Sequence, residues 1–173
     1  FSKGVFNYNT KSPMPNVVGS VSLGQRFLNN KLGVIVAGSY QNTYRGSNST
    51  FYSSSVTGTD AYATITSKSD RQYSEQQKRY GLHAKADYVF NKHNKIGWYN
   101  MYVRLDNVQV RDAVSTTYNG VYNPQAGNAE LTYSTRSRFT QQQIYNSTLQ
   151  GEHKLLSDHL KVKWSGVFAS AKN

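Results

Sequence analysis

The sequence predicts an all-β chain of antiparallel strands, and more specifically part of a transmembrane β-barrel. Three observations lead to this prediction: apolar and polar residues alternate with a period of two, tight turns join strands in pairs, and long polar connections join the pairs. Alternating short and long connections are typical of outer-membrane barrels, which have short periplasmic turns and long extracellular loops. About 9–11 residues of tilted strand cross the hydrocarbon layer, and the expected strands are at least that long.

Six strands are expected, in three hairpins. The paired segments are 16–27 with 32–45, 80–90 with 95–108, and 133–155 with 160–171. The short turns between them contain Asn29-Asn30, Asn91 to Asn94 and Ser157-Asp158, and Asn and Asp tolerate the left-handed backbone of a tight turn.

Each strand has one apolar and one polar face, because successive side chains point to opposite sides. The residues expected to face lipid are Leu82, Ala84, Ala86, Tyr88, Leu160, Val162 and Trp164. Those expected to face a hydrated lumen are His83, Lys85, Arg104, Lys161 and Lys163.

The composition restricts the class of protein. The chain has 173 residues, a hydrophobic fraction of 37% and a mean hydropathy of −0.67. No apolar stretch approaches the ~20 residues of a membrane-spanning helix. An aromatic fraction of 13% argues against intrinsic disorder. The formal charge of +11 comes from scattered basic residues and not from a basic run, so nucleic acid is not expected as a partner.

No catalytic, cofactor-binding or metal-binding site is expected, and the chain is not predicted to be an enzyme. It contains no cysteine, no glycine-rich phosphate loop and no metal-ligand spacing among its four histidines. The four histidines are expected to lie in turns or to face the lumen; they are His83, His93, His153 and His159. The run Ser157-Asp158-His159 has the residue types of a catalytic triad, but neighbours in a tight turn do not converge on one reacting atom.

The two long connections, about 46–78 and 109–132, are the segments in which ligand binding is expected. Aromatic rings and basic groups there suit a sugar or a siderophore chelate, although outer loops are often polar and tyrosine-rich without any ligand. The candidates are Tyr44, Arg45, Phe51, Tyr52, Tyr62, Lys68, Arg71, Tyr73, Arg111, Tyr118 and Tyr122.

Two stretches resemble the barrel of TonB-dependent outer-membrane receptors. They are GSVSLGQRF with LNNKLGV (Gly19–Val34) and STRSRFTQQQIYNSTLQGEHKL with LKVKWSGVFASAKN (Ser134–Leu155 and Leu160–Asn173). The resemblance implies an outer-membrane transport receptor of a Gram-negative type bacterium that takes up a large scarce nutrient, such as a siderophore or glycan. The implied partners are outer-membrane lipid, the TonB complex, the extracellular nutrient and a surface lipoprotein. No cofactor is implied.

In that family a plug fills a barrel of 22 strands, so six strands are expected to be a fragment of it. On this basis residues 1–15 are a loop or the end of the plug region, and residues 16–173 are part of the barrel domain. TonB would act through an N-terminal part that is missing here. Two alternatives remain open. One is a complete eight-stranded barrel with a further hairpin inside 46–78, where Ala61 to Thr66 alternate; the other is a soluble basic all-β binding module.

Overall fold

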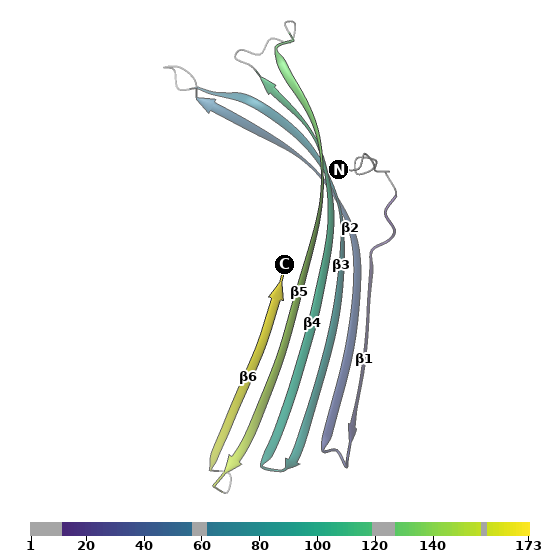
Figure 1. Cartoon of the computed structure of the whole chain (residues 1–173), viewed down its shortest axis with the longest axis vertical. Helices are drawn as coiled ribbons and strands as arrows, with labels where there is room; N and C mark the ends of the chain where they lie inside the picture. The colour runs from purple at the N-terminus through teal and green to yellow at the C-terminus, as the bar shows by residue number, and fades with distance from the viewer. Residues whose placement is uncertain (1–11, 57–61, 119–126, 157–158) are drawn as a thin grey trace. The chain divides into compact units, whose positions relative to one another are not determined.

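The computed structural model describes residues 12–56, 62–118, 127–156 and 159–173, which contain six strands and no helix. The strands are β1 (Val17–Phe27), β2 (Leu32–Val56), β3 (Ala63–Asn91), β4 (Asn94–Tyr118), β5 (Ala129–Leu155) and β6 (Leu160–Lys172). They form one sheet in the order β1-β2-β3-β4-β5-β6, so each strand pairs with its neighbours in the sequence (Figure 1). The predicted all-β fold and the three antiparallel hairpins are confirmed. No helix in the described ranges is long and apolar enough to cross a membrane.

The chain divides into two compact units. Unit 1 includes Tyr44–Gln76 and Val108–Phe139, and unit 2 includes Asn16–Thr43, Gln77–Asn107 and Thr140–Asn173. Unit 2 therefore holds β1, β6 and one end of each of the four strands between them. Unit 1 holds the other ends of β2 to β5.

The predicted long connections are for the most part strand, which corrects the sequence analysis. Residues 46–56 continue β2, 63–78 begin β3, and 109–118 continue β4. These residues are rich in Ser, Thr and Tyr, and side chains on both faces of a sheet can be polar where neither face is buried. Residues 46–56 belong to β2 and residues 63–78 belong to β3, so the described residues form six strands. They do not form the extra hairpin of the eight-stranded alternative.

The short turns form as their asparagines predict. Leu28, Asn29 and Asn30 all have left-handed backbone, with φ of 54°, 54° and 65°, and Leu28 O accepts a hydrogen bond of 3.1 Å from Lys31 N. In the second turn, Asn91 Oδ1 accepts hydrogen bonds from His93 N at 2.9 Å and from Asn94 Nδ2 at 3.0 Å. Each turn reverses the chain within a few residues, and this fixes which residues of the two strands lie opposite each other.

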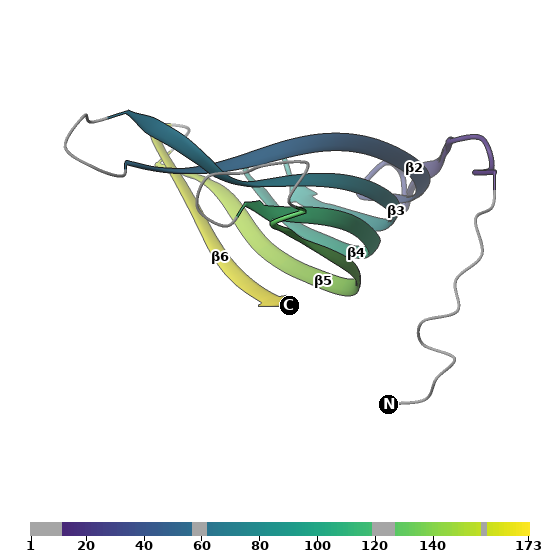
Figure 2. The same cartoon turned by 90° about the horizontal axis from the view of Figure 1, so that it is seen from above.

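The described residues have almost no hydrophobic core. Ala113 is the one buried apolar residue among them, and Thr43 and Ser69 are the buried polar ones. Large apolar side chains are instead exposed: 63% of Val21, 60% of Leu82 and 64% of Phe168 is accessible. The strand order leaves β1 and β6 at opposite edges of the sheet, and Figure 2 shows β6 at one of these edges.

Two faces can be assigned in unit 2 from register and side-chain contacts. Residues paired in register share a face, as Leu23 and Val36 do, and so do Gly151 and Trp164. We call one face the Trp164 face; its large or apolar residues are Val21, Leu23, Phe27, Val36, Tyr40, Tyr80, Leu82, Ala84, Ala86, Tyr88, Phe90, Trp98, Tyr145, Leu149, Leu160, Val162 and Phe168. The opposite face, the Lys85 face, carries Arg26, His83, Asp87, Lys95, Tyr99, Gln150, Glu152, Lys161 and Lys163. The predicted separation of apolar and charged residues in β3 and β6 is confirmed.

Arg104 is an exception, and the prediction that it lies beside Lys85 is wrong. Arg104 Nε bonds Asp106 at 3.0 Å, and Asp106 accepts a hydrogen bond of 3.0 Å from Gln141. Strand alternation places these three residues on the Trp164 face, whereas the ring of Tyr99 lies 4.6 Å from that of His83 on the Lys85 face. The face of a residue in β4 is therefore set by its register with β3 and not by its polarity.

Candidate functional site

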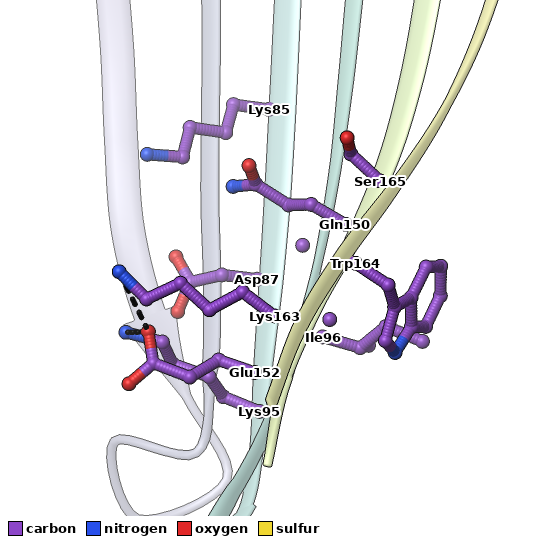
Figure 3. A pocket seen from close by; sticks show the side chains of 11 residues that line it. Lys85, Asp87, Lys95, Ile96, Gln150, Glu152, Lys163, Trp164 and Ser165 are labelled. Carbon is purple, nitrogen blue, oxygen red and sulfur yellow. Dashed lines mark ion pairs between the residues drawn. The ribbon is translucent and has the colours of Figure 1, made fainter. Parts of the chain in front are cut away.

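The charged residues of unit 2 gather around a hollow on the Lys85 face with a volume of about 590 Å³. Figure 3 shows Lys85, Asp87, Glu152 and Lys163 on one side of the strands and Trp164 on the other. The hollow is lined by Lys85, Asp87, Lys95, Ile96, Gly97, Gln150, Gly151, Glu152, Lys163, Trp164 and Ser165. The lining residues come from four neighbouring strands, β3, β4, β5 and β6, and strand alternation places Lys85, Glu152 and Lys163 on the same face.

Glu152 is the centre of an ion-pair network at this hollow. Its Oε1 lies 2.7 Å from Lys161 Nζ, and its Oε2 lies 3.3 Å from Lys95 Nζ and 4.0 Å from Lys163 Nζ. The side chain of Glu152 is 19% exposed while the three lysines are about half exposed or more, at 47%, 57% and 66%. One carboxylate thus forms ion pairs with three ammonium groups that are accessible to water.

A second ion pair extends the charged surface to β1. Arg26 Nη2 lies 2.9 Å from Asp87 Oδ2. The pair passes over Gly33, where a Cβ would come within 2.5 Å of Asp87 Oδ1 and 2.8 Å of Arg26 Nη1. The absence of a side chain at Gly33 is what allows these two residues to meet across β2.

The opposite side of unit 2 has no charge over the length of its apolar span. Along β3, the Trp164 face runs from Phe90 to Tyr80 through Tyr88, Ala86, Ala84 and Leu82. The span from Tyr80 to Phe90 is eleven residues long, which matches the roughly 9–11 residues of a tilted strand that crosses a bilayer. Aromatic residues lie at both ends of this span, as in the aromatic girdles of membrane barrels.

Charge returns on that face directly beyond Tyr80. Lys78 lies on this face of β3, two residues before Tyr80, and Arg104 and Asp106 lie on this face of β4. The apolar span therefore has a sharp polar boundary.

Unit 1 is polar on both faces. On the face that we call the Asp70 face, Asp70 accepts a hydrogen bond of 2.7 Å from Thr50 Oγ1 and pairs with Lys68 Nζ at 2.7 Å. The hydrogen bond from Lys68, and then that from Thr50, holds the pKa of the Asp70 carboxyl below its usual value. The same contact raises the pKa of Lys68. A polar hollow of about 430 Å³ lies here, lined by Asn48, Ser49, Thr50, Asp70, Arg71, Gln72, Asp112 and Val114.

The other side of unit 1, the Arg71 face, carries guanidinium groups beside an aromatic ring. The Arg71 guanidinium lies 4.9 Å from the centre of the Phe51 ring, within cation–π range. Gln109 donates a hydrogen bond of 3.3 Å to Glu75 Oε2 and accepts one of 3.5 Å from Arg136. These last three side chains form a row across β3, β4 and β5.

The predicted ligand residues are divided between the two faces of unit 1. Strand alternation from Phe51 and Arg71 places Arg45, Tyr73 and Arg111 on the Arg71 face. The Asp70 face carries Tyr44, Tyr52, Lys68 and Tyr118. Tyr62 directly precedes β3, and Tyr122 is outside the described residues.

Arg136 and Arg138 were missed as candidates. Both lie in β5, within a segment read as an ordinary barrel strand. The alternation of Ser134, Arg136 and Arg138 was a signal for a charged strand face, but only a known register could show that this face meets Arg111 on β4.

The histidines lie in different environments. His83 is on the Lys85 face and His93 is in a turn, whereas His153 is on the Trp164 face, opposite to Lys85. Ser157 and Asp158 lie outside the described ranges. Within those ranges, no three His, Asp or Glu side chains are grouped as metal ligands would be.

Comparison with known proteins gives no assignment: no family model matches the chain, and no curated protein matches it.

Proposed function

We propose that this chain is part of the β-barrel of a TonB-dependent outer-membrane receptor that takes up a large scarce nutrient, such as a siderophore or glycan. The observation that carries the proposal is the Trp164 face of unit 2, an exposed apolar surface without charge between Phe90 and Tyr80. Exposed apolar patches of this extent are uncommon on soluble monomers and mark contact with a membrane or a partner. Its length along β3 and its aromatic ends favour lipid.

The Lys85 face supports the same proposal from the other side of the sheet. Its lysines and carboxylates are mutually paired and partly hydrated, as in the network around Glu152. Such groups suit a wide, water-filled or plug-filled lumen, because charges taken out of water lose several kcal/mol of solvation per ion.

The open edges at β1 and β6 favour a larger barrel over a complete small one. A membrane sheet needs every edge strand paired, since unpaired backbone groups in hydrocarbon cost several kcal/mol each. Six strands in the order β1 to β6 leave two edges that further strands would pair with. A soluble binding module is disfavoured by exposed residues such as Leu82 and Phe168.

The proposal is tested by tagging the natural protein within its host and measuring its size and membrane fraction. We expect a heat-modifiable outer-membrane protein of about 80–120 kDa, the size of a plugged barrel of some 22 strands. A mass of about 20 kDa, or a soluble protein, would refute it.

Uptake is tested separately, by comparing ligand accumulation in cells with and without TonB. Loss of accumulation without TonB is the expected result.

A further inference from the structure

The arginines of unit 1 are collected on one face of its sheet. Five arginines belong to the described residues of this unit, and alternation along the strands places all five on the Arg71 face: Arg45, Arg71, Arg111, Arg136 and Arg138. The contacts of Arg71 with Phe51 and of Arg136 with Gln109 fix this assignment on β2 to β5.

Among the described residues of unit 1, this face carries more positive than negative charge. Five arginines face two glutamates, Glu75 and Glu130, which leaves three positive charges in excess. Glu75 is engaged by Gln109. No ion pair between described residues involves any of the five arginines. On the Asp70 face, by contrast, Lys68 has a carboxylate partner at 2.7 Å.

Arg111 has a hydrogen-bond donor that no described residue accepts. Its Nε is buried and has no hydrogen-bond partner within the described part of the chain. A buried donor without a partner destabilises a protein unless something else accepts its hydrogen bond. The guanidinium is a planar fork of donors that matches the two oxygens of a carboxylate or phosphate.

From these observations we propose that the Arg71 face binds a ligand carrying two or more carboxylate or phosphate groups. Arg136 and Arg138 are two residues apart on one strand, so their guanidiniums engage separate anionic groups about 7 Å apart. Arg71 and Phe51 provide a flat cationic and aromatic surface for the body of the ligand. The inference rests on the proposed function, because it names the chemical class of the nutrient that the receptor takes up.

The test is titration of the protein, purified from membranes in detergent, with citrate, tripolyphosphate and a neutral oligosaccharide of similar size. We expect binding of at least one anion and no binding of the neutral sugar, and the tighter anion identifies carboxylate or phosphate as the preferred group. The R136Q/R138Q variant should bind that anion about tenfold more weakly or worse. The affinity of the R136K/R138K variant for that anion should lie between those of the parent and of R136Q/R138Q, because lysine keeps the charge but lacks the planar fork of donors.

The matched control is Lys68→Gln, which removes one positive charge from the opposite face of the same unit. We expect its affinity to stay within about twofold of the parent, since exposed charges at a distance are largely screened. Absence of anion binding to the parent, or equal losses in K68Q and R136Q/R138Q, overturns the inference. Either result leaves the membrane location of unit 2 untouched, because that is measured by lipid accessibility and not by binding.

Discussion

The indole Nε1 of Trp164 donates a hydrogen bond of 3.0 Å to Nε2 of His153 on the neighbouring strand. An indole nitrogen only donates, so Nε2 is the acceptor and the ring proton is on Nδ1, which donates to Asn94 Oδ1 at 2.8 Å. Both ring nitrogens of His153 therefore have hydrogen-bond partners on the Trp164 face. The indole lies directly over Gly151, where any Cβ would collide with it.

Gly151→Ala should therefore displace the indole of Trp164 and break its hydrogen bond to His153. We expect the fluorescence of Trp164, read in a Trp98→Phe background, to change its emission maximum and its quenching by brominated lipid. Gly166→Ala is the matched control, because it lies on the same face of β6 and a Cβ there meets nothing within 4 Å. Equal spectra for the two glycine variants would contradict the packing described.

Ala84→Arg should destabilise the protein by about 2–4 kcal/mol if Ala84 lies near the bilayer midplane. The reason is that Ala84 belongs to the uncharged span between Phe90 and Tyr80. Lys85→Arg, one residue along the same strand, should cost far less because Lys85 lies on the charged face. The measurement is reversible unfolding in detergent or lipid, and equal losses at the two positions would count against the assignment of faces.

Lys68→Met should raise the pKa of Asp70 toward the value of a free aspartate, because the hydrogen bond from Lys68 is the largest cause of its depression. A depressed carboxyl pKa stabilises the fold above the unfolded value, near 3.9, and this contribution is lost as the pH falls through the folded value. The raised pKa of Lys68 stabilises the fold fully below the unfolded value, near 10.4, and this contribution is lost as the pH rises through the higher folded value. NMR titration of Asp70 tests the shift, and an unchanged pKa in the variant would show that the contact does not form.

Glu152→Gln should lower the free energy of unfolding only slightly. The ammonium groups that surround Glu152 are about half exposed or more, and exposed pairs of this kind contribute little to stability. A double-mutant cycle with Lys161→Met measures the coupling, which we expect to be small and to shrink at high salt. A larger, salt-independent coupling would mean that this surface is dehydrated.

The sequence predicted the strands of this protein better than their lengths or the faces of their residues. In β3 and β6 the apolar alternation is strong, so the separation of Ala84 and Trp164 from Lys85 onto opposite faces was predicted correctly. In β4, Arg104 was assigned to the wrong face, because register across a hairpin depends on backbone pairing that the alternation of one strand does not contain.

The ends of β2 to β5 were missed as strands for a different reason. Residues such as Thr50, Asp70 and Ser115 pair polar side chains on both faces, so no apolar periodicity marks them. The five arginines of the Arg71 face come from four strands, and only the order and register of those strands bring them together.

Contact between the Trp164 face and lipid can be measured with spin labels at consecutive positions of β3. Single cysteines replace residues 82 to 87 one at a time in the protein in outer-membrane vesicles, and the relaxation of each label by oxygen and by a water-soluble nickel chelate is measured. We predict a period of two, with labels at Leu82, Ala84 and Ala86 relaxed by oxygen and labels at His83, Lys85 and Asp87 not. Labels without alternation, or labels at Leu82, Ala84 and Ala86 that are relaxed by the nickel chelate, would contradict the account.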